Sequence, residues 1–310
     1  MTPFLWTMTV LLVGSLVVLF ALTLTSSSRA SAVRRLGRSV GLAVPEGHEA
    51  ALAARAARKT RASVLGAFLG TALVVLGFVT GIIPAADPES NVSDLWLVIG
   101  GYFVGLAIGA MINTLGYRPA PVEGERFARS GAVDLRDYLA PVDRYGARVS
   151  VLFGVLALGG AMLLFATGYI QLNPLASVSA AVVGLGVVSL AIFEFSARRI
   201  LDRAQPVGSP AELAWDDALR AQNVREIATA PISLGLWGSL AVLLTLLDQP
   251  IPINPAGDLL FGLLIAAVAV LLTVALIATV YSIATAPQQH YLRRLWPSVA
   301  ADLARPMAAR

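Results

Sequence analysis

The sequence predicts an all-α polytopic membrane protein with seven transmembrane helices, arranged as one lead helix followed by three parallel helical-hairpin repeats. Three observations predict this architecture. Hydrophobic residues make up 57% of the 310 residues and charged residues only 14%, whereas about a quarter of a soluble domain is charged. The apolar residues gather in long blocks, and two of the predicted hairpins resemble each other in sequence. A chain with so few charges cannot solvate the surface of a water-soluble fold.

Seven stretches reach the length of about 20 apolar residues that a bilayer core requires. They cover about 4–24, 63–84, 95–116, 149–170, 175–197, 230–247 and 258–284. Residues 1–8 carry no charged side chain, and the positive charges follow the first stretch instead of preceding it as they do in a cleavable signal. We therefore expect an uncleaved first span in a single membrane domain, 1–310.

The basic residues all lie on one side of the predicted membrane. The 23 Lys and Arg residues fall in three connections and the C-terminal tail: 25–62, 117–148, 198–229 and 285–310. The other connections are short and contain Asp and Glu as their only charged residues. Because cytoplasmic loops carry the excess of Lys and Arg, we expect a plasma-membrane protein with its N-terminus outside and its C-terminus in the cytoplasm. The preference for Arg over Lys is typical of bacterial proteins from GC-rich genomes.

An internal repeat joins the second and fourth spans. Arg61-Ala-Ser-Val-Leu opens one and Arg148-Val-Ser-Val-Leu opens the other, 87 residues later. Phe78-Val-Thr-Gly-Ile-Ile and Phe165-Ala-Thr-Gly-Tyr-Ile close them at the same offset. Spans 2–3 and 4–5 are interpreted as two parallel copies, and spans 6–7 as a diverged third copy. A duplication kept for packing alone is the alternative to one that serves transport.

Small residues predict where helices pack closely. Gly101, Gly105 and Gly109 recur every fourth residue in the third span, and the second span adds Gly66 and Gly70. Such glycines let another helix backbone approach, and that helix can belong to the same chain or to a second copy in a homo-oligomer. Just inward, Asn113 and Thr114 are interpreted as interhelical hydrogen-bonding groups in preference to a substrate site.

Charge is almost absent from the spans. Glu194 lies near the inner end of the fifth span with Arg198 one turn later, and the two are interpreted as an interfacial ion pair or as a gate. No ionisable residue lies near any span centre. This argues against a proton pump and against an intramembrane hydrolase, so we expect the protein not to be an enzyme.

Composition limits the cofactors and partners. The chain has no cysteine and two histidines, His48 and His290, both in polar segments. We therefore expect no metal and no cofactor. No Gly-x-x-x-x-Gly-Lys-Ser/Thr motif is present, so the chain does not hydrolyse nucleotides through a P-loop. Because the basic residues border the apolar blocks, anionic lipid headgroups in the bilayer are expected partners and nucleic acid is not.

The inner connections contain two segments with helical patterns, 49–61 and 210–226. Ser209 suits an N-cap, and Glu212 completes a capping box. A candidate partner-docking face follows at Trp215, Asp216, Asp217 and Arg220. Trp215 is expected on the membrane surface or under a protein partner. The two aspartates point about 100° apart on a helix and no third ligand is evident, so a solvated or partner-facing helix is favoured over a metal site.

The segment 203–225 resembles a stretch of poorly characterised multispan membrane proteins of actinobacteria. The resemblance covers about 30 residues around this segment, with Arg203-Ala-Gln-Pro-Val followed by Glu212-Leu-Ala-Trp-Asp-Asp-Ala-Leu-Arg. Such proteins often accompany ABC-type ATPases, which implies a membrane subunit of a transport or export assembly energised by a separate cytoplasmic ATPase. Inner helices around 49–61, 124–140 and 210–226 would then dock that ATPase. The alternative is a membrane scaffold or sensor that acts through helix–helix and loop contacts.

Overall fold

The computed structural model describes residues 3–44, 49–83, 92–116, 134–170, 174–202, 210–247, 249, 255–285 and 287–299. Every element in these ranges is helical. The helices are α1 (Pro3–Leu22), α2 (Ser26–Val40), α3 (Glu49–Val79), α4 (Val92–Gly116), α5 (Leu135–Tyr138), α6 (Pro141–Ala166), α7 (Pro174–Leu201), α8 (Pro210–Leu247), α9 (Pro255–Thr285), the 3-10 helix η1 (Pro287–Gln289) and α10 (His290–Leu295). The expected N-cap Ser209, the Arg203-Ala-Gln-Pro-Val joint and His48 lie outside the described residues.

The helices confirm a multi-pass membrane protein. Among the described residues, six helices (α3, α4, α6, α7, α8 and α9) are long and apolar enough to cross a bilayer. A seventh span exists if α1 and α2, which meet at an angle of 91°, are counted together. The side chains of Thr23 and Thr25 donate hydrogen bonds to the carbonyls of Phe20 and Leu22 at this bend. Each of the seven predicted spans falls on a helix, and the exact number of crossings stays a prediction.

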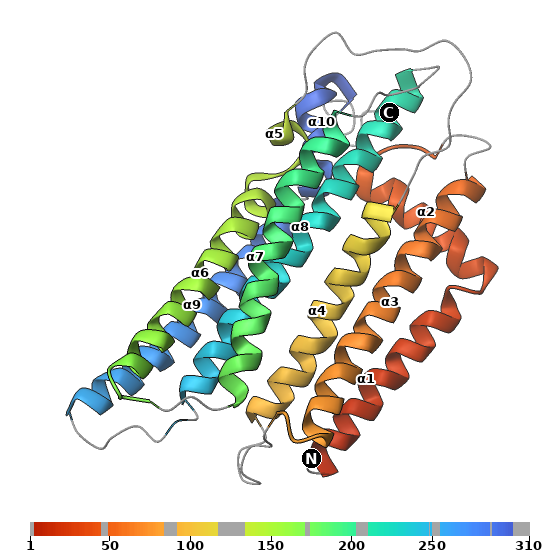
Figure 1. Cartoon of the computed structure of the whole chain (residues 1–310). Helices are drawn as coiled ribbons and strands as arrows, with labels where there is room; N and C mark the ends of the chain where they lie inside the picture. The colour runs from red at the N-terminus through yellow and green to blue at the C-terminus, as the bar shows by residue number, and fades with distance from the viewer. Residues whose placement is uncertain are drawn as a thin grey trace.

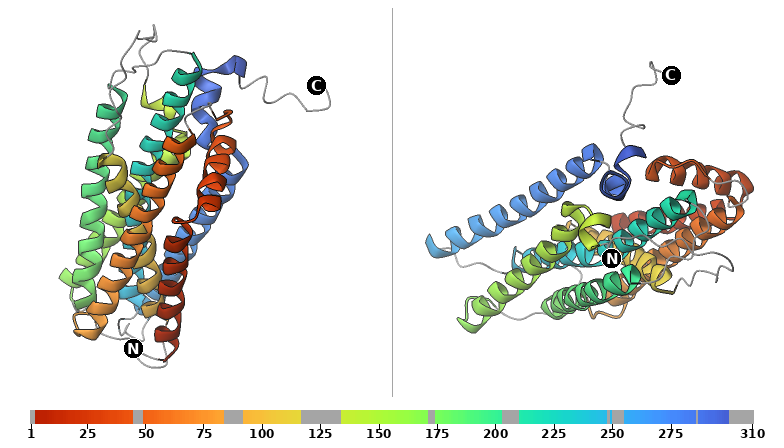
Figure 2. Two further views of the ribbon diagram at one scale, coloured as in Figure 1. Left: turned by 90° about the vertical axis from the view of Figure 1, so that its right-hand side faces the viewer. Right: turned by 90° about the horizontal axis from the view of Figure 1, so that it is seen from above.

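The helices form two groups, seen side by side in Figure 1. We call α1–α4 the first lobe and α6–α9 the second lobe. The main contact between the lobes is α4 against α8. Helices α6 and α7 both pack on α8, and α9 borders the bundle along α8 (Figure 2). Most of the apolar side chains of α9 are exposed. Helices α5 and α10 lie at the end of the bundle opposite the start of α1.

Helix α8 is the buried centre of the molecule. It contains 38 residues, or about 57 Å at 1.5 Å per residue, which exceeds the bilayer core of about 30 Å. The sequence suggested a separate inner helix, 210–226, and a span, 230–247, but the two are one continuous helix. Pro231 lies inside it and lacks the N–H that would bond to the carbonyl of Ile227. No other breaker separates the segments, so the helix continues through the proline.

Two helix ends repeat the same local geometry. Gly81 and Gly168, 87 residues apart, follow α3 and α6 with φ of +74° in each case, a conformation that favours glycine. The preceding Thr80 and Thr167 each donate a side-chain hydrogen bond to the carbonyl four residues earlier. The packing differs, however: α3 contacts α4 along its length, whereas α6 and α7 mainly contact α8.

The inner connections pack together as a small hydrophobic cluster. We call α2, the first turns of α3, α5, the first part of α8 and α10 the inner cap, after the side of the membrane on which the sequence predicts them to lie. Its buried residues come from five helices and include Val33, Leu52, Tyr138, Trp215 and Tyr291. The apolar faces of these segments therefore cover one another. Docking of a partner by the inner helices stays a prediction, and residues 124–133 of the expected helix 124–140 lie outside the described residues.

Candidate functional site

The predicted glycines meet along the seam between α3 and α4. A Cβ atom at Gly66 would overlap the carbonyl oxygen of Gly105, and one at Gly70 would overlap that of Gly101. A Cβ atom at Gly109 would overlap the carbonyl of Ala62. The closely packed partner of α4 is therefore α3 of the same chain, which answers the question that the sequence left open. The seam makes the two helices one stiff unit of the first lobe.

Aromatic side chains fill the outer part of the junction between α4 and α8. The rings of Phe103 and Trp237 are stacked, with centroids 5.8 Å apart and planes 10° apart. Trp96 lies 5.8 Å from Trp237 in a tilted arrangement. Gly100 leaves room for the indole, because a Cβ atom there would lie 3.1 Å from the Trp237 ring. Large apolar rings therefore hold the two lobes together here.

An apolar groove of about 450 Å³ runs between the lobes. It is lined by α3 and α4 on one side and by α7 and α8 on the other, and it includes the glycine seam. The side chains lining it include Leu65, Val104, Val182, Leu185 and Trp237, and none of the described lining residues is ionisable. The described lining therefore offers no charged group to an ion.

Polar contacts replace the apolar ones at the inner part of the same junction. Lys59 Nζ lies 2.6 Å from Glu226 Oε1, and Thr114 Oγ1 donates to Glu226 Oε2 at 2.9 Å. Arg55 donates to Asn223 Oδ1 at 2.6 Å. Thr114 thus makes the interhelical hydrogen bond that its sequence context predicted. Helices α3 and α4 are both tied to α8, since each carboxylate oxygen of Glu226 has a donor from the first lobe.

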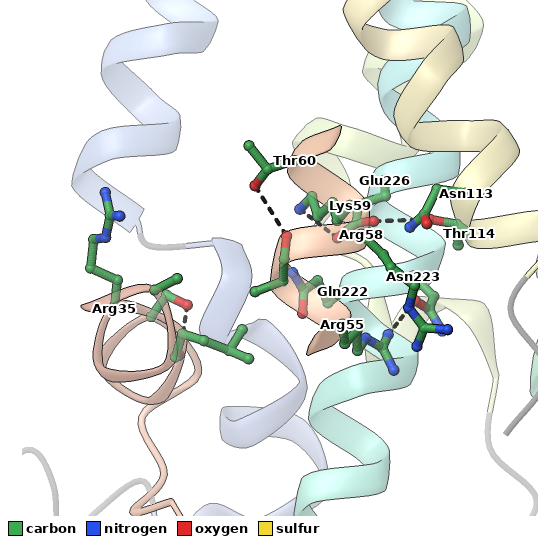
Figure 3. Close-up of a pocket in the computed structure, with 14 residues that line it drawn as sticks. Arg35, Arg55, Arg58, Lys59, Thr60, Asn113, Thr114, Gln222, Asn223 and Glu226 are labelled. Carbon is green, nitrogen blue, oxygen red and sulfur yellow. Dashed lines mark hydrogen bonds and ion pairs between the residues drawn. The ribbon is translucent and has the colours of Figure 1, made fainter. Parts of the chain in front are cut away.

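A polar chamber of about 400 Å³, here called the basic chamber, lies beside these contacts. Side chains from α2, α3, α4 and α8 surround it (Figure 3). Four lining residues are cationic: Arg35, Arg55, Arg58 and Lys59. Glu226 is the one carboxylate among the described lining residues. Cationic side chains therefore outnumber carboxylates among the described lining residues.

A second chamber, of about 550 Å³, lies on another side of α8. It shares Lys59, Gln222 and Glu226 with the basic chamber and adds Asp143 and Arg225. Arg225 Nε donates to Asp143 Oδ2 at 2.9 Å, which ties α6 to α8. The lining charges of this chamber balance, so the charge excess belongs to the basic chamber.

The predicted pair Glu194 and Arg198 is not the ion pair that forms. Glu194 Oε1 lies 2.7 Å from the guanidinium of Arg148 on α6, and Arg198 lines the same exposed pocket. The side chains of Arg148 and Glu194 are 44% and 32% exposed, and such surface pairs contribute about 0–1 kcal/mol. The sequence showed only the neighbour on the same helix, whereas folding brings in Arg148 from the neighbouring helix α6.

The expected docking face of α8 is mostly internal, which corrects the sequence-based expectation. Trp215 is 6% exposed, and its Nε1 donates to the carbonyl of Ala43 at 2.7 Å. Arg220 pairs with Asp216 at 2.8 Å and donates to the carbonyl of Leu201 at 3.2 Å. The last carbonyls of a helix have no hydrogen-bond donor within that helix. Arg220 therefore supplies a donor to a carbonyl at the end of α7.

Asp217 is the polar centre of the inner cap. It is fully buried, and it accepts hydrogen bonds from Tyr138 Oη at 2.7 Å and Trp296 Nε1 at 3.0 Å. Tyr291 is also fully buried and donates to the carbonyl of Val40 at 2.8 Å. Burial, with the nearby Asp217 carboxylate, raises the pKa of Tyr291, so its hydroxyl remains a donor. These side chains hold the cap together and leave little of this face for a partner.

In the part of the chain that the structure describes, no three His, Asp or Glu side chains are grouped in a way that could hold a metal ion. Comparison with known proteins finds no match: no family model, curated protein or solved structure is similar to this chain.

Proposed function

We propose that the protein is a non-enzymatic integral membrane subunit of a transport or export assembly that works with a separate cytoplasmic ATPase. The observation that supports this proposal is the apolar groove between the lobes. A helical bundle that served packing alone would fill its centre with interlocked side chains. Here the two lobes meet mainly along α4 and α8 and leave a groove beside that contact.

The groove suits a cycle in which the lobes rock against each other. The glycine seam makes α3 and α4 move together, while α6 and α7 are held on α8. A small rotation about the α4–α8 contact changes the width of the groove, as repeat units do in alternating access. The apolar lining implies an apolar cargo, since an ion would lose its hydration without compensation.

The proposed topology has seven spans, with the N-terminus outside and the C-terminus in the cytoplasm. The hairpins α3–α4, α6–α7 and α8–α9 would be three parallel copies, and the shared ends at Gly81 and Gly168 support the first two. The inner cap then faces the cytoplasm. Because Trp215 and Asp217 are buried, the proposed ATPase contact moves to exposed cap residues such as Arg136 and Arg294.

Co-purification tests the proposal. The full chain, extracted in a mild detergent, is expected to bring down a nucleotide-binding protein, and the isolated complex is expected to hydrolyse ATP. Reversing charge with Arg136→Glu and Arg294→Glu should reduce this recovery, whereas Thr80→Glu at the opposite end of α3 should not. If no nucleotide-binding protein is recovered and no ATP turnover is found, the proposal fails and the membrane scaffold or sensor is favoured.

The scaffold alternative has lost one of its two contact surfaces. The glycines of α4 are occupied by α3 of the same chain, so they offer no face to a partner helix. What remains for a scaffold is the exposed part of the inner cap and the apolar outer faces of α6 and α9, which contact bilayer lipid or, in a homo-oligomer, a second copy. The co-purification experiment therefore separates the two functions by the kind of partner it recovers.

A further inference from the structure

The apolar groove between the lobes is long and narrow. On α4 its lining runs at helical spacing from Trp96 to Ile112, a distance of about 24 Å at 1.5 Å per residue. Its volume of about 450 Å³, spread over that length, gives a mean cross-section of about 19 Å². A helix with its side chains is about 10–12 Å across and needs about 80 Å² or more. The groove is therefore too narrow for a partner helix and has the width of one extended carbon chain, whose atoms pack against their neighbours at about 4 Å.

The walls of the groove explain why this space stays open. Gly66, Gly70 and Gly105 of the glycine seam line it and have no side chain with which to fill it. Val182 and Leu185 of α7 line the other side. Helix α3 packs mainly on α4, and α7 packs mainly on α8. The two pairs of helices meet through α4 and α8, so α3 and α7 leave the groove between them.

The open side of the groove is apolar and accessible from the surface of the molecule. Leu65, Leu69 and Leu73 on α3 line the groove and are exposed, as are Ile112 on α4 and Leu185 on α7. All three helices are long and apolar enough to cross a membrane. A lipid tail can therefore enter sideways from the bilayer without passing through water. Because none of the described lining residues is ionisable, a headgroup finds no charged partner in the groove and stays outside it.

Shape, and not hydrophobicity, decides what occupies the groove in a membrane. Lipid tails are as apolar as leucine side chains, so the hydrophobic effect favours neither the bilayer nor the groove. An unfilled space forfeits the dispersion contacts of its walls, and a single straight tail restores them. One leaflet reaches about 15 Å, half of the bilayer core of about 30 Å. The groove is therefore long enough for a whole tail.

We propose that the groove binds one straight acyl chain of a membrane phospholipid, which lies along α4 against the glycine seam with its headgroup outside. The tail touches both lobes, through Val104 on α4 and Val182 on α7. The inference rests on the proposed function in one respect, because it names the class of the apolar cargo. Binding itself needs only the chain and a lipid, so a negative result here leaves the co-purification test of the ATPase partner unaffected.

Photo-crosslinking of the purified full chain in detergent tests this proposal. The probe is a phosphatidylcholine with a diazirine in the middle of one palmitoyl chain, and mass spectrometry maps the labelled residues. Labelling is expected to saturate at one probe per chain and to gather on the lining residues of α3, α4 and α7. Unlabelled dipalmitoyl phosphatidylcholine should compete. Diphytanoyl phosphatidylcholine has the same headgroup but methyl-branched, wider tails, and should compete about tenfold less well, because extra methyl groups overpack a narrow site.

Matched substitutions separate the groove from the rest of the apolar surface. Val104→Phe and Val182→Phe place a ring in the groove from its two sides, and each should weaken the saturable labelling by about tenfold through overpacking. Val187→Phe makes the same change at an exposed position of α7 outside the groove and should be labelled like the wild type. Melting temperatures identify a variant that fails to fold, in which case the other groove variant carries the test.

Three outcomes would each overturn the proposal. The first is labelling that spreads without saturation over the exposed faces of α6 and α9, as expected for lipid that merely surrounds the protein. The second is equal competition by the two phosphatidylcholines, which would contradict selection by width. The third is unchanged labelling in both groove variants.

Discussion

At the residue scale, Glu226 is the side chain that forms most of the polar contacts between the two lobes. Its side chain is only 12% exposed, and its two oxygens accept hydrogen bonds from Lys59 on α3 and Thr114 on α4. A carboxylate at this depth persists only when its lost hydration is replaced by such bonds. Lys59, by contrast, is 36% exposed and keeps some contact with water. Glu226 is therefore the partner whose replacement disturbs the junction most.

We predict that Glu226→Gln lowers the free energy of unfolding by about 1–3 kcal/mol, because a partly buried charged hydrogen bond is lost and Lys59 keeps no counter-charge. Glu194→Gln is the matched control, since it removes the carboxylate of an interhelical pair that is more exposed. Its expected effect is within about 1 kcal/mol. Reversible unfolding in detergent measures both values. Equal effects would show that burial of the Glu226 pair does not matter.

At the scale of the elements, the sequence contains the signals for each helix but not for its partners. The glycine spacing in the third span predicted close packing, and α3 proved to be the helix that uses it. The segment 210–226 has a charged pattern that suggested an exposed helix, yet the structure buries Trp215 and Asp217. Charge pattern describes a helix by itself, whereas burial depends on α2, α5 and α10, which come from distant parts of the chain.

The glycine seam yields a prediction with an internal control. Gly105→Ala places a Cβ atom against the backbone carbonyl of Gly66, which has no side-chain freedom to move away. We expect α3 and α4 to separate and the chain to lose about 1–3 kcal/mol of stability. Gly159→Ala on α6 meets no atom within 4 Å and should be neutral or stabilising by about 0.5–1 kcal/mol. Thermal unfolding of both variants measures their stabilities. Equal stability of Gly105→Ala and Gly159→Ala would contradict close packing at the seam.

At the scale of the whole molecule, two lobes meet at one contact whose character changes along its length. Stacked rings hold its outer part, and the bonds of Glu226 hold its inner part. The apolar groove and the basic chamber both border this contact. The contact between the lobes is therefore apolar along one part of its length and polar along the other.

The number of crossings is a prediction for the whole chain, and the absence of cysteine makes it testable by labelling. In a seven-span protein α1 crosses the membrane, so an N-terminal tag and Thr80→Cys share the outer side. Glu49→Cys then lies inside and should react with a membrane-impermeant maleimide only after permeabilisation. Thr80→Cys should react in intact cells. A tag protected from external protease, with Thr80→Cys labelled from outside, would instead establish that α1 and α2 do not cross.

Hydropathy and charge determined by themselves that the protein is a helical, multi-pass membrane protein, and they located its apolar helices to within a few residues at their outer ends. This worked because a span must satisfy its own backbone hydrogen bonds and cover itself with apolar side chains, so the signal is local to each segment. Only the tertiary structure decided that Arg148 pairs with Glu194, that Lys59 meets Glu226, and that α8 is the buried centre. Those facts depend on residues far apart in the chain, and no local period or composition records which helices will pack against each other.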